Sequence, residues 1–484
     1  MMGVPDAAER YLALQRRLPA AWEADRAGSR VPRVVIALPS YSLDRNVLSH
    51  YGARVAPLEN RFLYAALRTA DFASRVVYLS SRPVDPEVFD AYLSLVPAAD
   101  HATIRARTLL VSPDDESIGP LAAKVLARPD LIDEVRRFIS DDLALIEPWN
   151  VTEAERDLAL ALDVPMNGTD PRLWRLATKS EGRRLFRASG VSHPAGVEDV
   201  TSVEEVVAAV RQMRSAGAAP AGVVVKLDDS VAGDGNVVLS AEKLDAGVET
   251  AVHAALPDWY APLLRAGGVV EELVAGDGFS SPSGQGEVLP NGDVQVLSTH
   301  DQRLGGESGQ VFEGCSFPAR DAYASEVAEC VAVVGRALRA KGAIGRFAVD
   351  LAVARAGSSW RVAALEINLR KGGTTHPFGV TRLLSGGRYD PPTNRFVLPD
   401  GSTRCYGATD NLVDDAWKGR KPAEAVQLLR HAGLAYDSAE VTGVIPHLLD
   451  CLAIDGRMGY TAIGRDRAHV AELEKRLFTA LAAG

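Results

Sequence analysis

The sequence has few cysteines, and their spacing excludes several kinds of site. The four cysteines are Cys315, Cys330, Cys405 and Cys451, and no two of them form a Cys-x-x-Cys pair. This distribution argues against structural zinc, thioredoxin-like redox chemistry and a disulfide framework. The nine histidines form no His-x-x-x-His pair, and neither a Walker lysine loop nor a Gly-x-Ser-x-Gly elbow occurs. Metalloprotease, P-loop and serine-hydrolase functions are therefore excluded.

The chain also lacks long apolar runs and an excess of positive charge. No stretch approaches the roughly 20 apolar residues that a bilayer span needs, and the first residues carry no basic or apolar leader. The 63 acidic and 53 basic side chains leave a formal net charge of -10. This charge disfavours a nucleic acid or an anionic membrane as partner. We expect a cytoplasmic protein that acts on small molecules.

The composition is that of an ordinary globular protein, and 484 residues correspond to about three domains. Apolar runs at 34–38 and 75–80, each followed by a helical pattern (59–70 and 86–95), predict a βαβ rhythm and a parallel sheet. Segments 108–111 and 143–147 are candidates for further strands. No Gly-x-Gly-x-x-Gly follows the first strand, so dinucleotide binding has little support. We predict an α/β domain over residues 1–165 that serves as a scaffold and substrate platform.

Two lysines lie at the boundaries of predicted elements in the next region. Lys179 precedes a helical pattern that ends at Gly190, and Lys226 lies on the apolar strand 222–227. The loop after this strand contains Gly233 and Gly235, and its backbone N–H groups are suited to phosphate oxygens. A plain hairpin explains the loop by itself. A lysine ammonium at the end of a buried strand needs an anion, however, and a nucleotide phosphate would satisfy both the lysine and the loop.

A second apolar strand is predicted over 268–272. It ends in acidic residues and is followed by a glycine hinge. An extended segment of this kind offers backbone N–H and C=O groups to an adenine edge, while a carboxylate just beyond it bonds ribose hydroxyls. The candidate acids are Glu271, Glu272 and Asp277. A strand end with solvated acids explains Glu272 equally well.

The most informative segments are 345–351 and 360–370, which we predict to be neighbouring antiparallel strands. Glu366, Asn368 and Arg370 alternate with apolar residues and therefore share one face. With Asp350 pointing the same way, two carboxylates and an amide oxygen form an oxygen-only site that suits Mg²⁺. Acids on a solvated outer face would not explain the uninterrupted polar row. We therefore predict that Asp350, Glu366 and Asn368 are metal ligands.

The order of these motifs over nearly the entire chain resembles the ATP-grasp superfamily of carboxylate–amine ligases. Segment 366–378, together with 298–302 upstream, is most similar to the peptide ligase of pheganomycin biosynthesis and its relatives. The resemblance implies a mixed α/β and α+β chain, with an ATP-grasp fold preceded by a Rossmann-like domain. The implied domains are a pre-ATP-grasp domain (1–165), a central lid domain (166–275) and a C-terminal catalytic domain (276–484), with ATP held between the last two sheets.

The resemblance also implies roles for individual residues. The implied ATP-binding residues are Lys179, Lys226, Gly233, Gly235, Glu271, Glu272, Val274 and Asp277. The implied Mg²⁺ ligands are Asp350, Glu366 and Asn368, and Arg370 faces the reacting carboxylate. Some relatives have an arginine two positions before the first metal acid, where this chain has Ala348. Arg346, two positions further back, is the candidate for that catalytic role.

The implied activity is an ATP- and Mg²⁺-dependent ligase that joins a carboxylate to an amine through an acyl phosphate, as in peptide natural-product biosynthesis. A small-molecule kinase and a non-catalytic nucleotide-binding protein are the alternatives. The expected partners are amino acids or peptides, and a homodimer is the commonest assembly for a soluble enzyme. Segments 276–286 and 302–309 are expected to be loops that close over the site. No role is assigned to His300, Asp301, Arg303 or His376.

Overall fold

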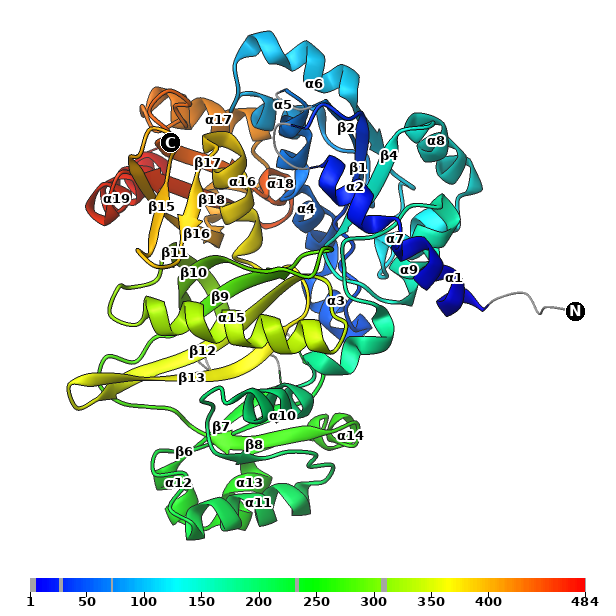
Figure 1. Ribbon diagram of the computed structural model, residues 1–484. Coiled ribbons are helices and arrows are strands. Elements are labelled where there is room, and N and C mark those ends of the chain that lie inside the picture. Colours follow the sequence, from blue (N-terminus) through cyan, green and yellow to red (C-terminus); the bar gives the residue numbers. More distant parts are fainter. Residues whose placement is uncertain (1–5, 26–28, 71–72, 231–234, 306–310, 484) are drawn as a thin grey trace, which may run out of the picture.

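The strands of this chain form three sheets, which are seen in the computed structural model of Figure 1. The structure describes residues 6–25, 29–70, 73–230, 235–305 and 311–483. The first sheet is parallel and lies in the N-terminal third, the second is small and antiparallel, and the third has ten strands. Within these ranges no helix has both the length and the apolar character that a membrane span requires.

The N-terminal sheet has four parallel strands in the order β3-β2-β1-β4. They are β1 (Arg33–Leu38), β2 (Ser74–Leu79), β3 (Thr108–Val111) and β4 (Leu143–Pro148). All six residues of β1 are buried, as expected for a strand with helices on both faces of its sheet. The predicted parallel sheet is therefore confirmed.

Helices connect and cover these strands. They are α1 (Ala7–Gln15), α2 (Leu18–Ala24), α3 (Arg45–Tyr51), α4 (Val55–Asn60), α5 (Pro86–Leu93), α6 (His101–Arg107), α7 (Leu121–Leu126), α8 (Pro129–Ile139) and α9 (Glu153–Leu162). The single helix predicted over 59–70 is wrong, because the chain forms α4 and then the 3-10 helix η2 (Leu63–Thr69). At this break the buried carboxylate of Glu59 accepts hydrogen bonds from the backbone N–H (2.6 Å) and the hydroxyl (2.7 Å) of Ser81.

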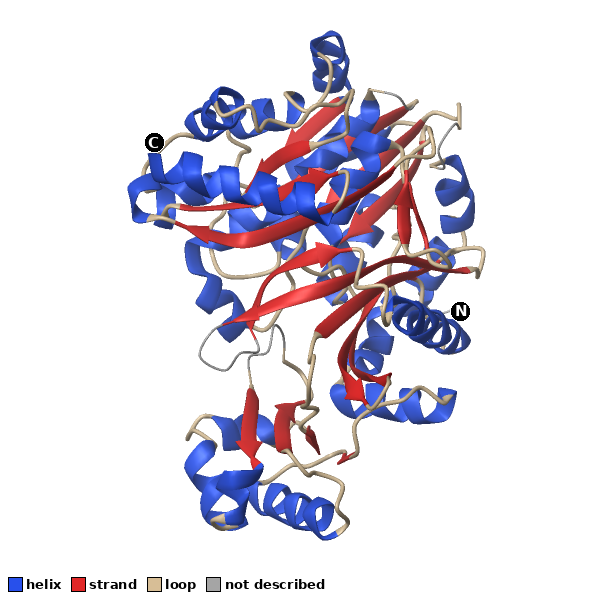
Figure 2. Cartoon of the chain, turned by 90° about the vertical axis from the view of Figure 1, so that its left-hand side faces the viewer, coloured by secondary structure: helices blue, strands red, loops and turns tan. Residues whose placement is uncertain are grey.

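The small sheet has the order β5-β8-β6-β7, and its strand pairs are antiparallel. Its strands are β5 (Gly196–Val197), β6 (Gly222–Leu227), β7 (Asn236–Ser240) and β8 (Gly268–Glu272). The accompanying helices are α10 (Lys179–Ser189), α11 (Val203–Ser215), α12 (Ala241–Asp245), α13 (Val248–Ala255) and α14 (Tyr260–Leu264). Figure 2 shows this sheet and its helices at one end of the molecule.

The large sheet forms the C-terminal half, and its main path runs β13-β12-β9-β10-β11-β16-β15-β14. Its strands are β9 (Ser281–Val288), β10 (Val294–Gly305), β11 (Val311–Phe317), β12 (Gly345–Ala356), β13 (Ser359–Asn368), β14 (Arg388–Asp390), β15 (Arg395–Val397), β16 (Thr403–Val413), β17 (Gly443–His447) and β18 (Arg457–Gly464). The helices of this half are α15 (Ala324–Ala340), α16 (Thr375–Ser385), α17 (Pro422–His431), α18 (Leu452–Asp455) and α19 (Arg467–Ala483).

One segment expected to be a closing loop is an interior strand. Residues 281–286 belong to β9, which pairs with β12 on one side and β10 on the other. Its glycines serve close packing, since a Cβ at Gly284 would lie 2.4 Å from Val331 Cγ2 on α15. The expectation of a mobile loop over 276–286 is therefore wrong for these residues. In the other expected loop, residues 302–305 complete β10 and residues 306–309 lie outside the described residues.

The packing of α15 on the large sheet predicts a large effect for Phe347. Its ring is buried at 2% exposure between Gly286 and Gly335, where added Cβ atoms would lie 2.3 and 2.9 Å from the ring. Phe347→Ala should cost about 3–5 kcal/mol because it opens a cavity, and thermal unfolding should occur at a clearly lower temperature. Leu263→Ala, at a side chain that is 45% exposed, is the control and should change stability by about 0.5 kcal/mol or less. Equal melting temperatures for Phe347→Ala and the parent would contradict this packing.

Candidate active site

The candidate site lies where β6, β8 and α10 approach β12 and β13 of the large sheet (Figure 1). Helix α10 begins at Lys179 because the Thr178 side chain caps it, accepting from the backbone N–H of Glu181 at 3.3 Å. Lys179 is 4% exposed and Lys226, on β6, is 5% exposed. Two ammonium groups are therefore buried on one side of the site, and each needs an anionic or polar partner.

Lys179 connects the loop after β6 to the large sheet. Its Nζ donates to the hydroxyl (2.9 Å) and the carbonyl (3.2 Å) of Ser230. The same Nζ lies 3.4 Å from Glu366 Oε2 on β13. The ammonium therefore connects two sheets that are distant in sequence.

Lys226 is held by a different acid. Its Nζ forms an ion pair with Glu271 on β8, and Arg183 Nη1 donates to the other oxygen of Glu271 at 3.2 Å. Glu271 and Arg183 are each only 1% exposed. The Glu271 carboxylate thus contacts two buried cations, of which Arg183 also pairs with Glu198 at 3.0 Å, so its side chain is fixed within the small sheet.

The acidic row lies on the facing strands β12 and β13. These strands pair antiparallel, with Asp350 opposite Glu366, which confirms the predicted neighbouring strands. The amide nitrogen of Asn368 donates to Asp350 Oδ2 at 2.9 Å and to Glu366 Oε1 at 3.3 Å. Gln302 Nε2 donates to Asp350 Oδ1 at 2.9 Å. The structure therefore brings the three predicted metal ligands together.

The two acids of this row differ in proton affinity. Burial and the neighbouring charge of Glu366 raise the pKa of Asp350 to about 6. Burial also opposes ionisation of Glu366, but the charges of Lys179, Lys226 and Arg370 outweigh it and lower the pKa of Glu366 to about 2. Burial and the adjacent carboxylate therefore favour the protonated form of Asp350, whereas the nearby cations keep Glu366 ionised. Two carboxylates beside an amide suit Mg²⁺, and the lysines suit phosphate oxygens.

The other predicted nucleotide residues surround β6 and β8. Gly235 has a φ of +80° and directly precedes the return strand β7, and its carbonyl accepts from the Tyr260 hydroxyl at 2.7 Å. Gly233 lies outside the described residues. Val274 is buried against Ala352 and Ala354. Asp277 is exposed, with its carbonyl accepting from the Arg355 backbone N–H at 2.9 Å.

Glu272 occupies a different environment from the other candidates. Its two oxygens accept from Arg361 Nη1 and Nη2 at 2.6 and 2.7 Å. Burial opposes ionisation of Glu272, but the hydrogen bonds and charge of Arg361 outweigh it and lower its pKa. Because both oxygens bind one guanidinium, this carboxylate cross-links β8 to β13.

The two candidate catalytic arginines lie in different surroundings. The Arg370 guanidinium stacks over Trp149 at 5.0 Å from the ring centroid, and its charge helps to lower the pKa of Glu366. Arg346 Nε lies 3.3 Å from Glu287 Oε2 on β9. Arg370 therefore belongs to the acidic row, whereas Arg346 belongs to a second polar cluster.

This second cluster was not found from the sequence. It forms at the carboxyl end of β4, where Asn167 Nδ2 donates to Glu147 Oε1 (2.8 Å) and to Glu287 Oε1 (3.1 Å). Lys371 Nζ lies 3.1 Å from Glu147 Oε2. Burial opposes ionisation of Glu147, but Lys371, Asn167 and Arg346 lower its pKa. A signal was present, since carboxyl ends of parallel strands are the usual ligand edge of a sheet.

Comparison with known proteins adds independent information. The family model described as the PGM1 C-terminal domain matches residues 424–477. The L-propargylglycine–L-glutamate ligase of Streptantibioticus cattleyicolor is 31% identical over 415 residues, which cover 82% of this chain and 83% of that protein. This level of identity over most of both chains indicates common descent.

Solved structures share the fold at low identity. A biotin carboxylase from Campylobacter jejuni in complex with βγ-ATP has a TM-score of 0.56 and 12% identity, and the match covers 91% of this chain and 89% of that one. The ADP complex of an N5-carboxyaminoimidazole ribonucleotide synthetase has a TM-score of 0.52 and 13% identity over 93% of this chain and 97% of that one. These likenesses concern the arrangement of the three sheets.

Because the pKa values of Asp350 and Glu366 are shifted in opposite directions, replacing each acid by its amide should change the stability of the metal-free protein in opposite directions. The raised pKa of Asp350 means that its ionisation destabilises the fold above about pH 6. Asp350→Asn should therefore raise the melting temperature near neutral pH and have little effect near pH 4. Glu366 has a lowered pKa, so its charge stabilises the fold above its unfolded pKa, and Glu366→Gln should lower the melting temperature near neutral pH. Thermal unfolding in EDTA measures both. A loss of stability in Asp350→Asn near neutral pH would refute this charge balance.

Proposed function

This chain belongs to the ATP-grasp carboxylate–amine ligases, near the peptide ligase of pheganomycin biosynthesis, and we propose that it joins two amino acids, or an amino acid and a peptide, by an amide bond. It is an ATP-dependent ligase, and its proposed cofactors are ATP and Mg²⁺. The amino-acid substrates are supported by the name of the relative from Streptantibioticus cattleyicolor, which joins L-propargylglycine to L-glutamate. No protein nucleophile is required for this chemistry.

The observation that carries the proposal is the meeting of buried cations and acids between the two sheets. Lys179 lies 3.4 Å from Glu366, and Asn368 bridges Glu366 and Asp350. A nucleotide with its metal supplies both counter-charges: phosphates for the lysines and a divalent cation for the carboxylates. Lys179 and Glu366, which contact each other directly without ligand, would then bind a phosphate and the divalent cation respectively.

Asp350, Glu366 and Asn368 would hold Mg²⁺, which neutralises charge on the transferred phosphoryl group when bound. Asn368 now points its amide nitrogen at both acids, and a half-turn of this amide would present its oxygen instead. Lys179, Lys226 and the loop with Gly233 and Gly235 would bind phosphates. The backbone from Glu271 to Val274 would contact adenine, and Asp277 would bind ribose. Glu272 would act on the nucleotide only indirectly, by fixing β8 to β13 through Arg361.

The reaction would proceed in two steps. A carboxylate oxygen of the donor attacks the γ-phosphorus of ATP, the bond from phosphorus to the ADP oxygen breaks, and an acyl phosphate forms. The acceptor amine then attacks the acyl carbon, the bond to phosphate breaks, and the amine loses a proton to give the amide. Arg370, beside the acidic row, would stabilise the oxyanion of the second step. Its stacking on Trp149 holds the guanidinium in place before substrate arrives.

We assign substrate recognition to the polar cluster of Glu147, Asn167, Glu287, Arg346 and Lys371. Lys371 directly follows Arg370, so the cluster continues from the reacting centre toward the carboxyl end of β4. Fixed charges of both signs fit the amino and carboxyl groups of an amino acid. Arg346 would therefore bind and orient substrate, from a position nearer the start of β12 than Asp350.

The proposed domains are 1–165, 166–275 and 276–484. This division is supported by the sheets, because β1–β4, β5–β8 and β9–β18 each fall within one range. The nucleotide would then lie between the last two sheets. The homodimer and the cytoplasmic location stay predictions.

The test is incubation with MgATP and pools of amino acids and short peptides, with and without hydroxylamine. We expect ADP, phosphate and a product whose mass equals the two substrates less water, and a hydroxamate when hydroxylamine replaces the amine. Glu366→Ala should lower the rate by about 100-fold or more, whereas Glu329→Gln, on the exposed side of α15, should not change it. AMP in place of ADP would indicate adenylation, and a phosphorylated alcohol would indicate a kinase; either would overturn the ligase mechanism.

A second prediction concerns Arg370. Because its proposed contact forms in the transition state, Arg370→Ala should lower kcat about 100- to 1,000-fold and leave the Kd of MgATP nearly unchanged. Arg370→Lys keeps the charge and should recover part of kcat. Single-turnover kinetics and nucleotide titration separate the two quantities. A large rise in the Kd of MgATP with normal kcat would place Arg370 in nucleotide binding instead.

A further inference from the structure

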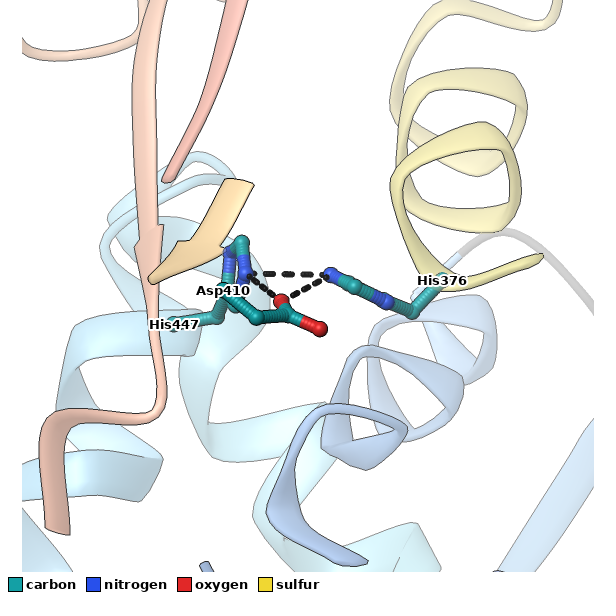
Figure 3. A group of neighbouring side chains, drawn as sticks. All are labelled: His376, Asp410 and His447. Atoms are coloured by element: carbon teal, nitrogen blue, oxygen red, sulfur yellow. Dashed lines mark hydrogen bonds and ion pairs between the residues drawn. The ribbon is translucent and has the colours of Figure 1, made fainter. Parts of the chain in front are cut away.

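Two buried histidines and a half-buried aspartate outside the acidic row converge on one point (Figure 3). They are His376 in the first turn of α16, Asp410 on β16 and His447 at the end of β17. The two histidines are each 3% exposed, and the Asp410 side chain is 14% exposed. Residues from three separate elements therefore present two imidazole nitrogens and one carboxylate oxygen to each other.

The separations match those of ligands around one small ion. His447 Nε2 lies 2.7 Å from Asp410 Oδ1, His376 Nε2 lies 3.4 Å from the same oxygen, and the two Nε2 atoms are 3.1 Å apart. Zn²⁺ binds nitrogen and oxygen at about 2.0–2.2 Å, so neighbouring ligand atoms at octahedral or tetrahedral angles lie about 2.8–3.6 Å apart. The three measured distances fall within or close to this interval.

Hydrogen bonding alone holds this arrangement poorly. Suppose that His447 donates its Nε2 proton to Asp410. His376 Nε2 then either carries no proton and points its lone pair at the same N–H, or carries a proton and points its own N–H at that of His447. In the first case it shares one proton with Asp410, and in the second the two like dipoles oppose each other. Among the residues that the structure describes, none forms a hydrogen bond with the buried His376 Nδ1. A cation between the three atoms accepts a lone pair from each.

The surroundings keep these three atoms in place. Arg61 forms an ion pair with the other oxygen of Asp410 and donates to the Tyr41 hydroxyl, so that Oδ1 is directed toward the histidines. Opposite His447 in the sheet lies Gly459, where a Cβ would lie 2.1 Å from His447 Nε2. The close approach of the imidazole to β18 therefore requires a glycine at this position. Hydrogen-bonded carboxylate ligands are usual in metal sites.

We propose that His376, Asp410 and His447 bind a divalent transition-metal ion of the Zn²⁺ type, separate from the proposed Mg²⁺ site. Imidazole ligands favour Zn²⁺ and its neighbours over Mg²⁺, which takes oxygen ligands. Three protein ligands leave a fourth position for water. The cysteine spacing argued against structural zinc, but a site made of histidines and an aspartate does not depend on that spacing.

The ion would fix the start of α16 relative to β16 and β17. Helix α16 follows the polar row that contains Arg370 and Lys371, and Thr375 donates to Gln285 Oε1 on β9 at 2.9 Å. The ion therefore cross-links the segment after the acidic row to the far edge of the large sheet. Its role is positional, and it takes no part in phosphoryl transfer.

The first test is the metal content of the full-length protein after growth with zinc and dialysis without chelator. We expect about one zinc per chain by inductively coupled plasma mass spectrometry, as for a single structural site. EDTA should lower the melting temperature, and added Zn²⁺ should restore it. The same protein with Co²⁺ should show visible absorption bands from nitrogen ligation. Absence of stoichiometric zinc, together with no shift in melting temperature with Zn²⁺ or Co²⁺, would overturn the proposal.

Matched variants locate the ion. His447→Asn and His376→Asn should lose zinc and the response to EDTA, while His300→Asn should keep both, because His300 is also buried but bonds Tyr406 (2.7 Å) and is not part of the converging group. Glu366→Gln should also keep zinc, which separates this site from the acidic row. Zinc lost in Glu366→Gln but kept in His447→Asn would place the ion at the acidic row and refute the proposal. If the histidine variants fail to fold, the chelator and Co²⁺ measurements on the parent protein still decide.

Discussion

The site depends on the burial of opposite charges between two sheets. Lys179 and Lys226 are both nearly inaccessible, and an ammonium in such a place is costly unless an anion accompanies it. Here the anions come from different strands: Glu271 within the small sheet and Glu366 across the gap. The approach of α10 to β13 follows from this requirement, because Lys179 contacts both Ser230 and Glu366. The surrounding packing holds these charges at a fixed separation.

The two acids of the site, Asp350 and Glu366, differ in how readily they ionise, and the proposed ligand binding depends on this difference. Glu366 is surrounded by cations and stays ionised, whereas burial and the neighbouring charge of Glu366 make Asp350 retain its proton more readily. In the proposed complex, a divalent cation would supply positive charge at Asp350. Phosphates in turn offer the lysines partners other than the protein's own acids. The protein without ligand therefore keeps these groups paired with each other, and in the proposed complex a nucleotide with its metal would replace those pairs.

Some of this arrangement was predictable because it follows from local periodicity. Alternation along a strand places Glu366 and Asn368 on one face, and two apolar runs close in sequence form a hairpin, so the pairing of Asp350 with Glu366 could be anticipated. The same reasoning failed for residues 281–286. Glycine and serine there suggested a loop, but their small size instead permits α15 to lie close to β9. Composition indicates small side chains and does not distinguish flexibility from close packing.

By itself, the sequence determined which residues share a face, where buried strands lie and which groups require counter-charges, because these properties depend on neighbours within a few residues. The tertiary structure alone decided which distant groups meet. Arg183 and Glu271 are 88 positions apart, and Lys371 and Glu147 are 224 apart. His376, Asp410 and His447 likewise come from one helix and two strands. The path of the backbone through the fold decides which of these residues meet, and no local sequence pattern predicts that path. Each residue of these pairs would also be compatible with a solvent-exposed position, and only the fold buries it beside its partner.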